Sequence, residues 1–164
     1  MFEGSKLEET VKGWMVESGF YQDRIEDEAA NFHLLAEYPE RSGSTIDIIN
    51  PKNRPDMILL VGSIEISPEH REGLRSLPPA KRREFLDNLM EKLIFQPVGF
   101  IANPSMDEPQ NIQLVRELYR EGITKQSFVE GLGWINRCIT FIAWRYRNTF
   151  DQEKKNDAPG SMYQ

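Results

Sequence analysis

The chain has 164 residues, of which 39% are hydrophobic and 28% charged, so it can bury a substantial core and is not a wholly disordered protein. Its single cysteine excludes a disulfide framework within the chain and a cysteine-rich metal site. The formal net charge of −6 argues against a dedicated nucleic-acid-binding protein.

The first predicted element is a helix over residues 6–18. Ser5 and Glu8 have the spacing of a capping box, in which each side chain satisfies a free backbone N–H. Gly19 supplies the left-handed residue that ends a helix. One helical face collects apolar side chains, namely Leu7, Val11, Trp14 and Met15.

The acidic charge is concentrated at the beginning of the chain. Residues 1–30 hold eight acidic and three basic side chains, and so carry most of the net charge. This pattern is typical of a solvated first helix and hairpin, since charge balance mainly reports solubility. The alternative interpretation is an acidic face that meets a basic partner.

Strand-like segments follow the first helix. Residues 25–28 are short and polar, which suits an edge strand. Residues 31–38 alternate apolar and polar with a period of two, and Pro39 ends that strand. Residues 45–50 and 57–66 are rich in β-branched and apolar side chains. The short turns between these segments favour an antiparallel meander.

Two helices, two strands and a long helix complete the chain. Ser67 and Pro68 form a helix start, and a second helix begins at Pro78-Pro79. Residues 97–102 and 112–119 are predicted strands, and Thr124 caps a helix that runs to about residue 150. This order predicts an α+β fold, with an antiparallel sheet flanked by an N-terminal helix and a long C-terminal helix.

Residues 1–150 are predicted to form a single α+β domain, and residues 151–164 a flexible polar tail. The N-terminus lacks the basic start and apolar stretch of a signal peptide, and no segment is apolar enough to span a membrane. A lone thiol without a signal fits a reducing compartment. We therefore expect a cytoplasmic protein.

The last helix is apolar on more than one face. One heptad seam consists of Phe128, Leu132, Ile135, Ile139, Ile142 and Tyr146. A second seam has the same spacing: Gly131, Trp134, Cys138, Phe141 and Arg145. One seam must cover the sheet, so the other needs a second cover, from the same chain or from a partner. We predict a partner or dimer surface at Trp134, Cys138, Phe141 and Trp144, because large aromatic side chains are enriched at interfaces.

Catalytic constellations are not evident. His33 and Glu37 share one side of a strand at a distance of roughly 13 Å, which is too far to share a metal. His70 begins a short helix beside Glu69 and Glu72, where we expect it to be solvated. Cys138 is expected to be a core residue. No phosphate-binding loop occurs, and we predict no catalytic residue, metal or cofactor. The alternative is an enzyme or ligand sensor that combines His33 or His70 with the acidic hairpin or Glu65.

Several short stretches resemble an uncharacterised archaeal family. They are Val11–Trp14, Gly19–Phe20, Ile25–Glu28, Asn31–His33, Tyr38–Pro39, Ile48–Pro51, Ile64–His70 and the last helix after Tyr119–Thr124. The resemblance covers about residues 7–146. The order of elements is also similar to the fold of type III secretion chaperones and their non-secretory relatives. This resemblance implies a helix-flanked sheet that often dimerises and holds another protein. We therefore expect a homodimer with a possible protein client and with no nucleic-acid or membrane partner.

Overall fold

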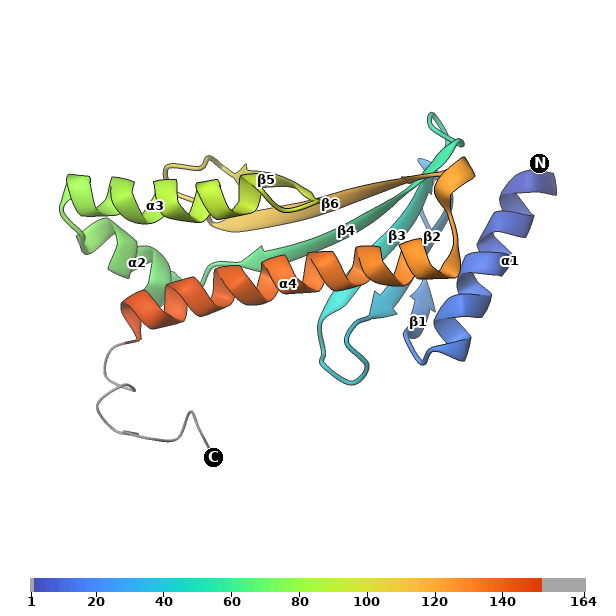
Figure 1. The fold of residues 1–164 in the computed structure, drawn as a ribbon, viewed down its shortest axis with the longest axis horizontal. Helices are drawn as coiled ribbons and strands as arrows, with labels where there is room; N and C mark the ends of the chain where they lie inside the picture. Colours follow the sequence, from blue (N-terminus) through green and yellow to red (C-terminus); the bar gives the residue numbers. More distant parts are fainter. Residues whose placement is uncertain (1, 152–164) are drawn as a thin grey trace.

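The computed structural model describes residues 2–151, which form a six-stranded antiparallel sheet with helices packed on it (Figure 1). The elements in chain order are α1 (Phe2–Glu17), β1 (Tyr21–Arg24), β2 (Ala30–Glu37), β3 (Thr45–Pro51), β4 (Met57–Glu65), α2 (Pro68–Ser76), α3 (Pro79–Ile94), β5 (Gly99–Asn103), β6 (Asn111–Tyr119), the 3-10 helix η1 (Arg120–Gly122) and α4 (Lys125–Phe150). The predicted α+β class, with an N-terminal and a long C-terminal helix, is confirmed.

The strands follow one another in sequence order across the sheet, except that β6 lies between β4 and β5. The strands lie in the order β1-β2-β3-β4-β6-β5, and every neighbouring pair is antiparallel. The buried Asn50 stabilises the turn between β3 and β4, because its amide donates to the carbonyls of Pro55 and Met57 at 3.3 and 2.7 Å. Its side-chain oxygen accepts from Asn31 at 2.8 Å, so this buried polar group is satisfied.

The core lies between the sheet and its helices. α1 packs on β1 and β2, α4 crosses β4 and β6, and α2 and α3 pack beside α4 (Figure 1). Two glycines let α4 approach β4 closely. A Cβ at Gly62 would lie 2.5 Å from Ile135 Cγ2, and one at Gly131 would lie 2.5 Å from Leu60 Cδ1. Gly131 therefore lets α4 lie directly against a side chain of β4.

Two predicted boundaries are wrong at the start of the chain. α1 begins at Phe2, ahead of the start predicted from Ser5. Residues 25–28 are not a strand: the edge strand is Tyr21–Arg24, and a turn at Asp27 follows it. In that turn the Asp27 carboxylate accepts the Ala29 N–H at 3.0 Å, and the Asp27 carbonyl accepts the Ala30 N–H at 3.2 Å. Aspartate favours such turns, and this preference outweighs strand pairing here.

Most of the predicted tail, residues 151–164, lies outside the described residues, and only Asp151 is described. No helix within residues 2–151 combines the length and the apolar character needed to cross a bilayer. The helix starts predicted at Ser67 and Thr124 are confirmed, because each side chain accepts a backbone N–H of the first turn.

Candidate functional site

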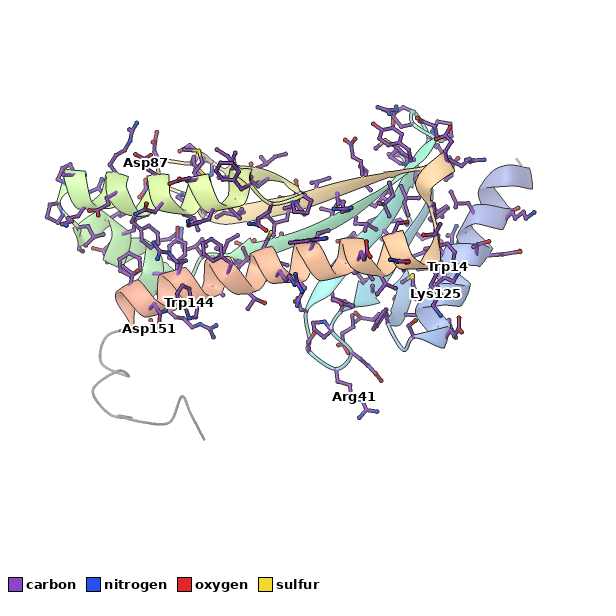
Figure 2. All side chains as sticks on the ribbon, viewed as in Figure 1. Trp14, Arg41, Asp87, Lys125, Trp144 and Asp151 are labelled. Carbon is purple, nitrogen blue, oxygen red and sulfur yellow. The ribbon has the colours of Figure 1, made fainter. Side chains whose placement is uncertain are left out.

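The predicted partner surface lies along α4, beside the end of α3. The first seam of α4 faces the core. On the second seam, Trp134 and Phe141 are half-buried and Cys138 is only 2% exposed. Trp144, labelled in Figure 2, is 49% exposed. The aromatic side chains thus reach the surface, while Cys138 supports them from the core.

A groove separates α3 from α4 at this point. It has a volume of about 250 Å³ and is lined by Lys92, Gln96, Arg137, Cys138 and Phe141. Two large apolar side chains beside Gln96 are strongly exposed, with Ile94 at 61% and Phe95 at 80%. The groove therefore has a partly apolar floor and two cationic side chains, and the chain next to it at the end of α3 exposes two large apolar side chains.

Cys138 is not a nucleophile at neutral pH. Burial disfavours the thiolate and raises the pKa of the Cys138 thiol to about 11. The core role expected for this residue is confirmed, since its side chain belongs to the main hydrophobic cluster.

A wider hollow lies closer to the N-terminal end of α4, next to Tyr38 just after β2. Its volume is about 560 Å³, and its lining includes Val129, Glu130, Gly133 and Trp134. The guanidinium of Arg137 lies 5.1 Å from the centre of the Trp134 ring, which is the geometry of a cation–π contact. Arg137 therefore partly covers Trp134 and borders both hollows.

His33 is held between two carboxylates. Its Nδ1 lies 3.0 Å from Asp27 Oδ2, and its Nε2 lies 2.6 Å from Asp47 Oδ1. A neutral imidazole has one N–H, so only the imidazolium form donates to both carboxylates. The hydrogen bond from His33, together with the Ala29 N–H, lowers the pKa of the Asp27 carboxyl. The predicted neighbour Glu37 is not among these partners, and neither is Glu65.

This arrangement fixes the β1–β2 loop to the sheet. Asp27 lies in the loop, His33 in β2 and Asp47 in β3, so the imidazole connects three segments. Both ring nitrogens are occupied by hydrogen bonds. Within residues 2–151, no group of three or more histidine, cysteine or acidic side chains is arranged to hold a metal ion. The geometry supports a structural role for His33.

His70 is less solvated than predicted. Its Nε2 lies 2.7 Å from Asp151 Oδ1, and its ring stacks on Tyr146 with centroids 5.8 Å apart. The prediction was wrong because α4 returns over α2, which brings a residue 81 positions away to the histidine. His33 and His70 have separate sets of partners, so the structure does not unite them in one site.

The second face of the sheet is a further candidate surface, and sequence reasoning did not identify it. The side chains that point away from the helices include five that are apolar and half-buried: Leu35, Ile49, Leu59, Val61 and Val115. We call these five residues the apolar block. None of the five belongs to the core cluster on the helix side, although residues next to them in the same strands do. The signal was present in the run Met57–Val61, which is apolar at every position.

Comparisons with known proteins agree with this architecture. No curated protein sequence matches the chain. A crystal structure of an uncharacterised protein from Methanothermobacter thermautotrophicus is similar over 87% of this chain and 97% of that chain, with 30% identity and a TM-score of 0.81. A chain in the structure of the HopA1-SchA chaperone–effector complex shares the fold, with 11% identity, a TM-score of 0.52 and coverage of 85% of this chain and 98% of that chain.

The family comparison covers most of the sequence. Residues 7–146 match the family described as "Uncharacterized conserved protein (DUF2299)". The same residues carry the resemblance noted from the sequence, and they include the sheet, α2, α3 and most of α1 and α4. The chain therefore belongs to the DUF2299 family of uncharacterised conserved proteins.

Proposed function

We propose that this protein is a small cytoplasmic protein-interaction module with a chaperone- or adaptor-like role, and that it acts as a homodimer. The observation that carries the proposal is that the end of α3 and the outer face of α4 both expose large apolar side chains, which we call the α3–α4 edge. Ile94, Phe95 and Trp144 expose about half or more of their surface there. Burial of such side chains on association is favourable, at about 25 cal/mol per Å² of apolar surface.

The chemistry of His33 and Cys138 favours a binding role over a catalytic one. The His33 ring is engaged by two carboxylates, and the raised pKa of Cys138 keeps its thiol protonated. The mechanism would be passive: apolar side chains of the edge become buried, and the cationic Lys92 and Arg137 beside them select the orientation of the second copy. The fold shared with a chaperone–effector complex agrees with this proposal, although a fold alone does not define a function.

Native mass spectrometry tests the assembly. We expect a species at twice the chain mass of 19.1 kDa. A double variant, Phe95→Ser with Trp144→Ser, should shift the protein to the monomer, because it removes two exposed aromatic side chains from the edge. A protein that is monomeric at tens of micromolar would contradict the homodimer.

Tyr119→Ser is the matched control. Tyr119 is an aromatic residue with 45% exposure, close to the 49% of Trp144, but it lies on β6 and points away from the helices. It should leave the dimer intact. If the dimer survives the α3–α4 double variant and is lost in the control, the interface lies on the sheet and the proposed surface is wrong.

A further inference from the structure

The apolar block forms a continuous surface across four strands. Ile49 pairs with Leu59 between β3 and β4, and Val61 pairs with Val115 between β4 and β6. Leu35 on β2 is paired with Asp47 and lies diagonally across from Ile49, and Ile101 on β5, with 53% exposure, lies diagonally across from Val115. The helices described within residues 2–151 pack on the opposite face, so this apolar surface has no helix over it among the described residues.

The charge of this face has a single sign apart from one histidine. Acidic side chains occupy five of its outward positions, on five different strands: Asp23, Glu37, Asp47, Glu65 and Glu117. The strands contain two arginines, Arg24 and Arg116, and both lie on the helix side. Arg24 bonds Glu8 of α1 at 2.7 Å, and Arg116 donates to the Pro97 carbonyl at 2.8 Å.

Two of the cations that border the face are already engaged. His33 bridges Asp27 and Asp47. Arg54, in the β3–β4 turn, lies 3.2 Å from Asp56 and 5.9 Å from the centre of the Tyr119 ring. The outward face therefore combines an apolar centre with a surplus of carboxylates, and the chemistry that complements it is apolar and cationic.

We propose that the open sheet face binds a basic amphipathic helix of a partner protein. Apolar side chains of the helix would cover the apolar block, and its lysines and arginines would meet the five carboxylates. The proposal rests on the proposed function, since it names the partner class of the same interaction module. α4 on the opposite face illustrates this packing, because an apolar seam of that helix covers β4 and β6 there.

Alternative occupants fit this face less well. The central strands β2, β3, β4 and β6 have both neighbours in place, so an extended peptide would find no free backbone groups there. A second copy stacked face to face would bring five carboxylates of each chain against five of the other, which is repulsive. Nucleic acid carries the same sign of charge as the face.

The test is fluorescence anisotropy with an 18-residue peptide that has leucines at helical spacing and lysines elsewhere. We expect saturable binding that weakens as salt rises, because ion pairs at the rim contribute. The same peptide with glutamate for lysine should not bind. A scrambled peptide of equal composition should bind at least about tenfold more weakly, a difference of about 1.4 kcal/mol. Equal affinity for the ordered and scrambled peptides would overturn the proposal, because it would indicate attraction by charge alone.

Variants locate the site. Leu59→Ser should weaken binding of the lysine peptide at least about tenfold, with circular dichroism as the check on folding. Glu117→Gln keeps an exposed position polar, and it should weaken binding and reduce the salt dependence without affecting the fold. Val16→Ser is the control, because Val16 is 58% exposed on α1 and belongs to neither proposed surface, so this variant should bind as the parent protein does. Trp144→Ser tests whether the peptide binds at the α3–α4 edge instead.

The outcomes separate this proposal from the function on which it rests. If Leu59→Ser and Glu117→Gln bind like the parent protein while the dimer mass is unchanged, the sheet-face proposal is wrong and the interaction module stands. If Trp144→Ser alone abolishes binding, the partner surface is the α3–α4 edge, which also overturns it. A monomeric parent protein that still binds the lysine peptide through Leu59 would support the sheet face and contradict the homodimer.

Discussion

The two faces of the sheet are built from the same strands, yet they meet different surroundings. On β4, Leu60 is fully buried beneath α4, whereas the adjacent Leu59 points to the other side and is half-buried. On β2, Leu34 is buried and Leu35 is half-buried in the same way. Identical side chains thus serve as core or as surface, according to whether a helix lies above them.

The apolar side chains of the two faces differ in what covers them. The helix-covered face uses its apolar side chains to stabilise the fold, and two glycines keep α4 close to it. The open face keeps comparable apolar side chains, with carboxylates among them. Exposed apolar surface of this kind is costly to leave in water, and large patches on proteins commonly mark interaction sites.

The two leucines of β4 give the strongest test of this contrast. Leu60→Ala should lower the free energy of unfolding by about 2–5 kcal/mol, because it leaves a cavity in the core. Leu59→Ala should lower the free energy of unfolding by only about 1 kcal/mol, because the Leu59 side chain is half-buried and folding removes less of its apolar surface from water. Urea denaturation of both variants measures the difference. Equal losses would indicate that something covers the second face in solution.

The covered side also contains a buried polar atom. The hydroxyl of Tyr146 is buried with no hydrogen-bond partner found among the described residues, and burial raises the pKa of this side chain. Tyr146→Phe should therefore raise the free energy of unfolding by about 1 kcal/mol, because it removes an unsatisfied hydroxyl. The variant retains the ring contact with Phe85, whose centroid lies 5.0 Å away. A decrease in the thermal midpoint would show that the hydroxyl has a partner, such as a bound water.

The smallest expected effect is a pH dependence of stability that arises at Asp27, at the edge of the open face. The pKa of Asp27 is lowered in the folded protein by its hydrogen bonds from His33 and the Ala29 N–H. Its stabilising contribution is therefore fully present above the unfolded pKa of about 3.9 and is lost as pH falls through the lower folded value. Asp27→Asn should reduce stability at pH 6, and the difference from the parent protein should shrink towards pH 3.

His33→Gln is the companion variant, because it removes the donor to Asp27 while keeping a polar side chain. It should reduce the same acid dependence, and the effects of the two variants should not add, since they remove one shared interaction. Denaturation at several pH values between 3 and 6 measures both. A difference between Asp27→Asn and the parent protein that is constant over this range would contradict the assignment.

Local patterns predicted most elements, and the failures have physical causes. The period-two alternation of residues 31–38 and the caps at Ser67 and Thr124 are confirmed. The edge strand was misplaced because β1 has four mostly polar residues, and such a strand gains its stability from pairing with β2. The site contacts were harder to predict, since His33 meets Asp47 14 residues away and His70 meets Asp151 81 residues away.

The amino-acid order alone specifies most of the helices and strands of this chain, because propensity, caps and apolar periodicity act over a few residues. It also specifies that α4 has two apolar seams and that Met57–Val61 is apolar throughout. Only the tertiary structure decides which of these surfaces becomes core. α4 and the other helices settle on one side of the sheet, since the strand order and the glycines of β4 and α4 let them pack there. The opposite face, with the apolar block and its carboxylates, is thereby left without a helix over it among the described residues.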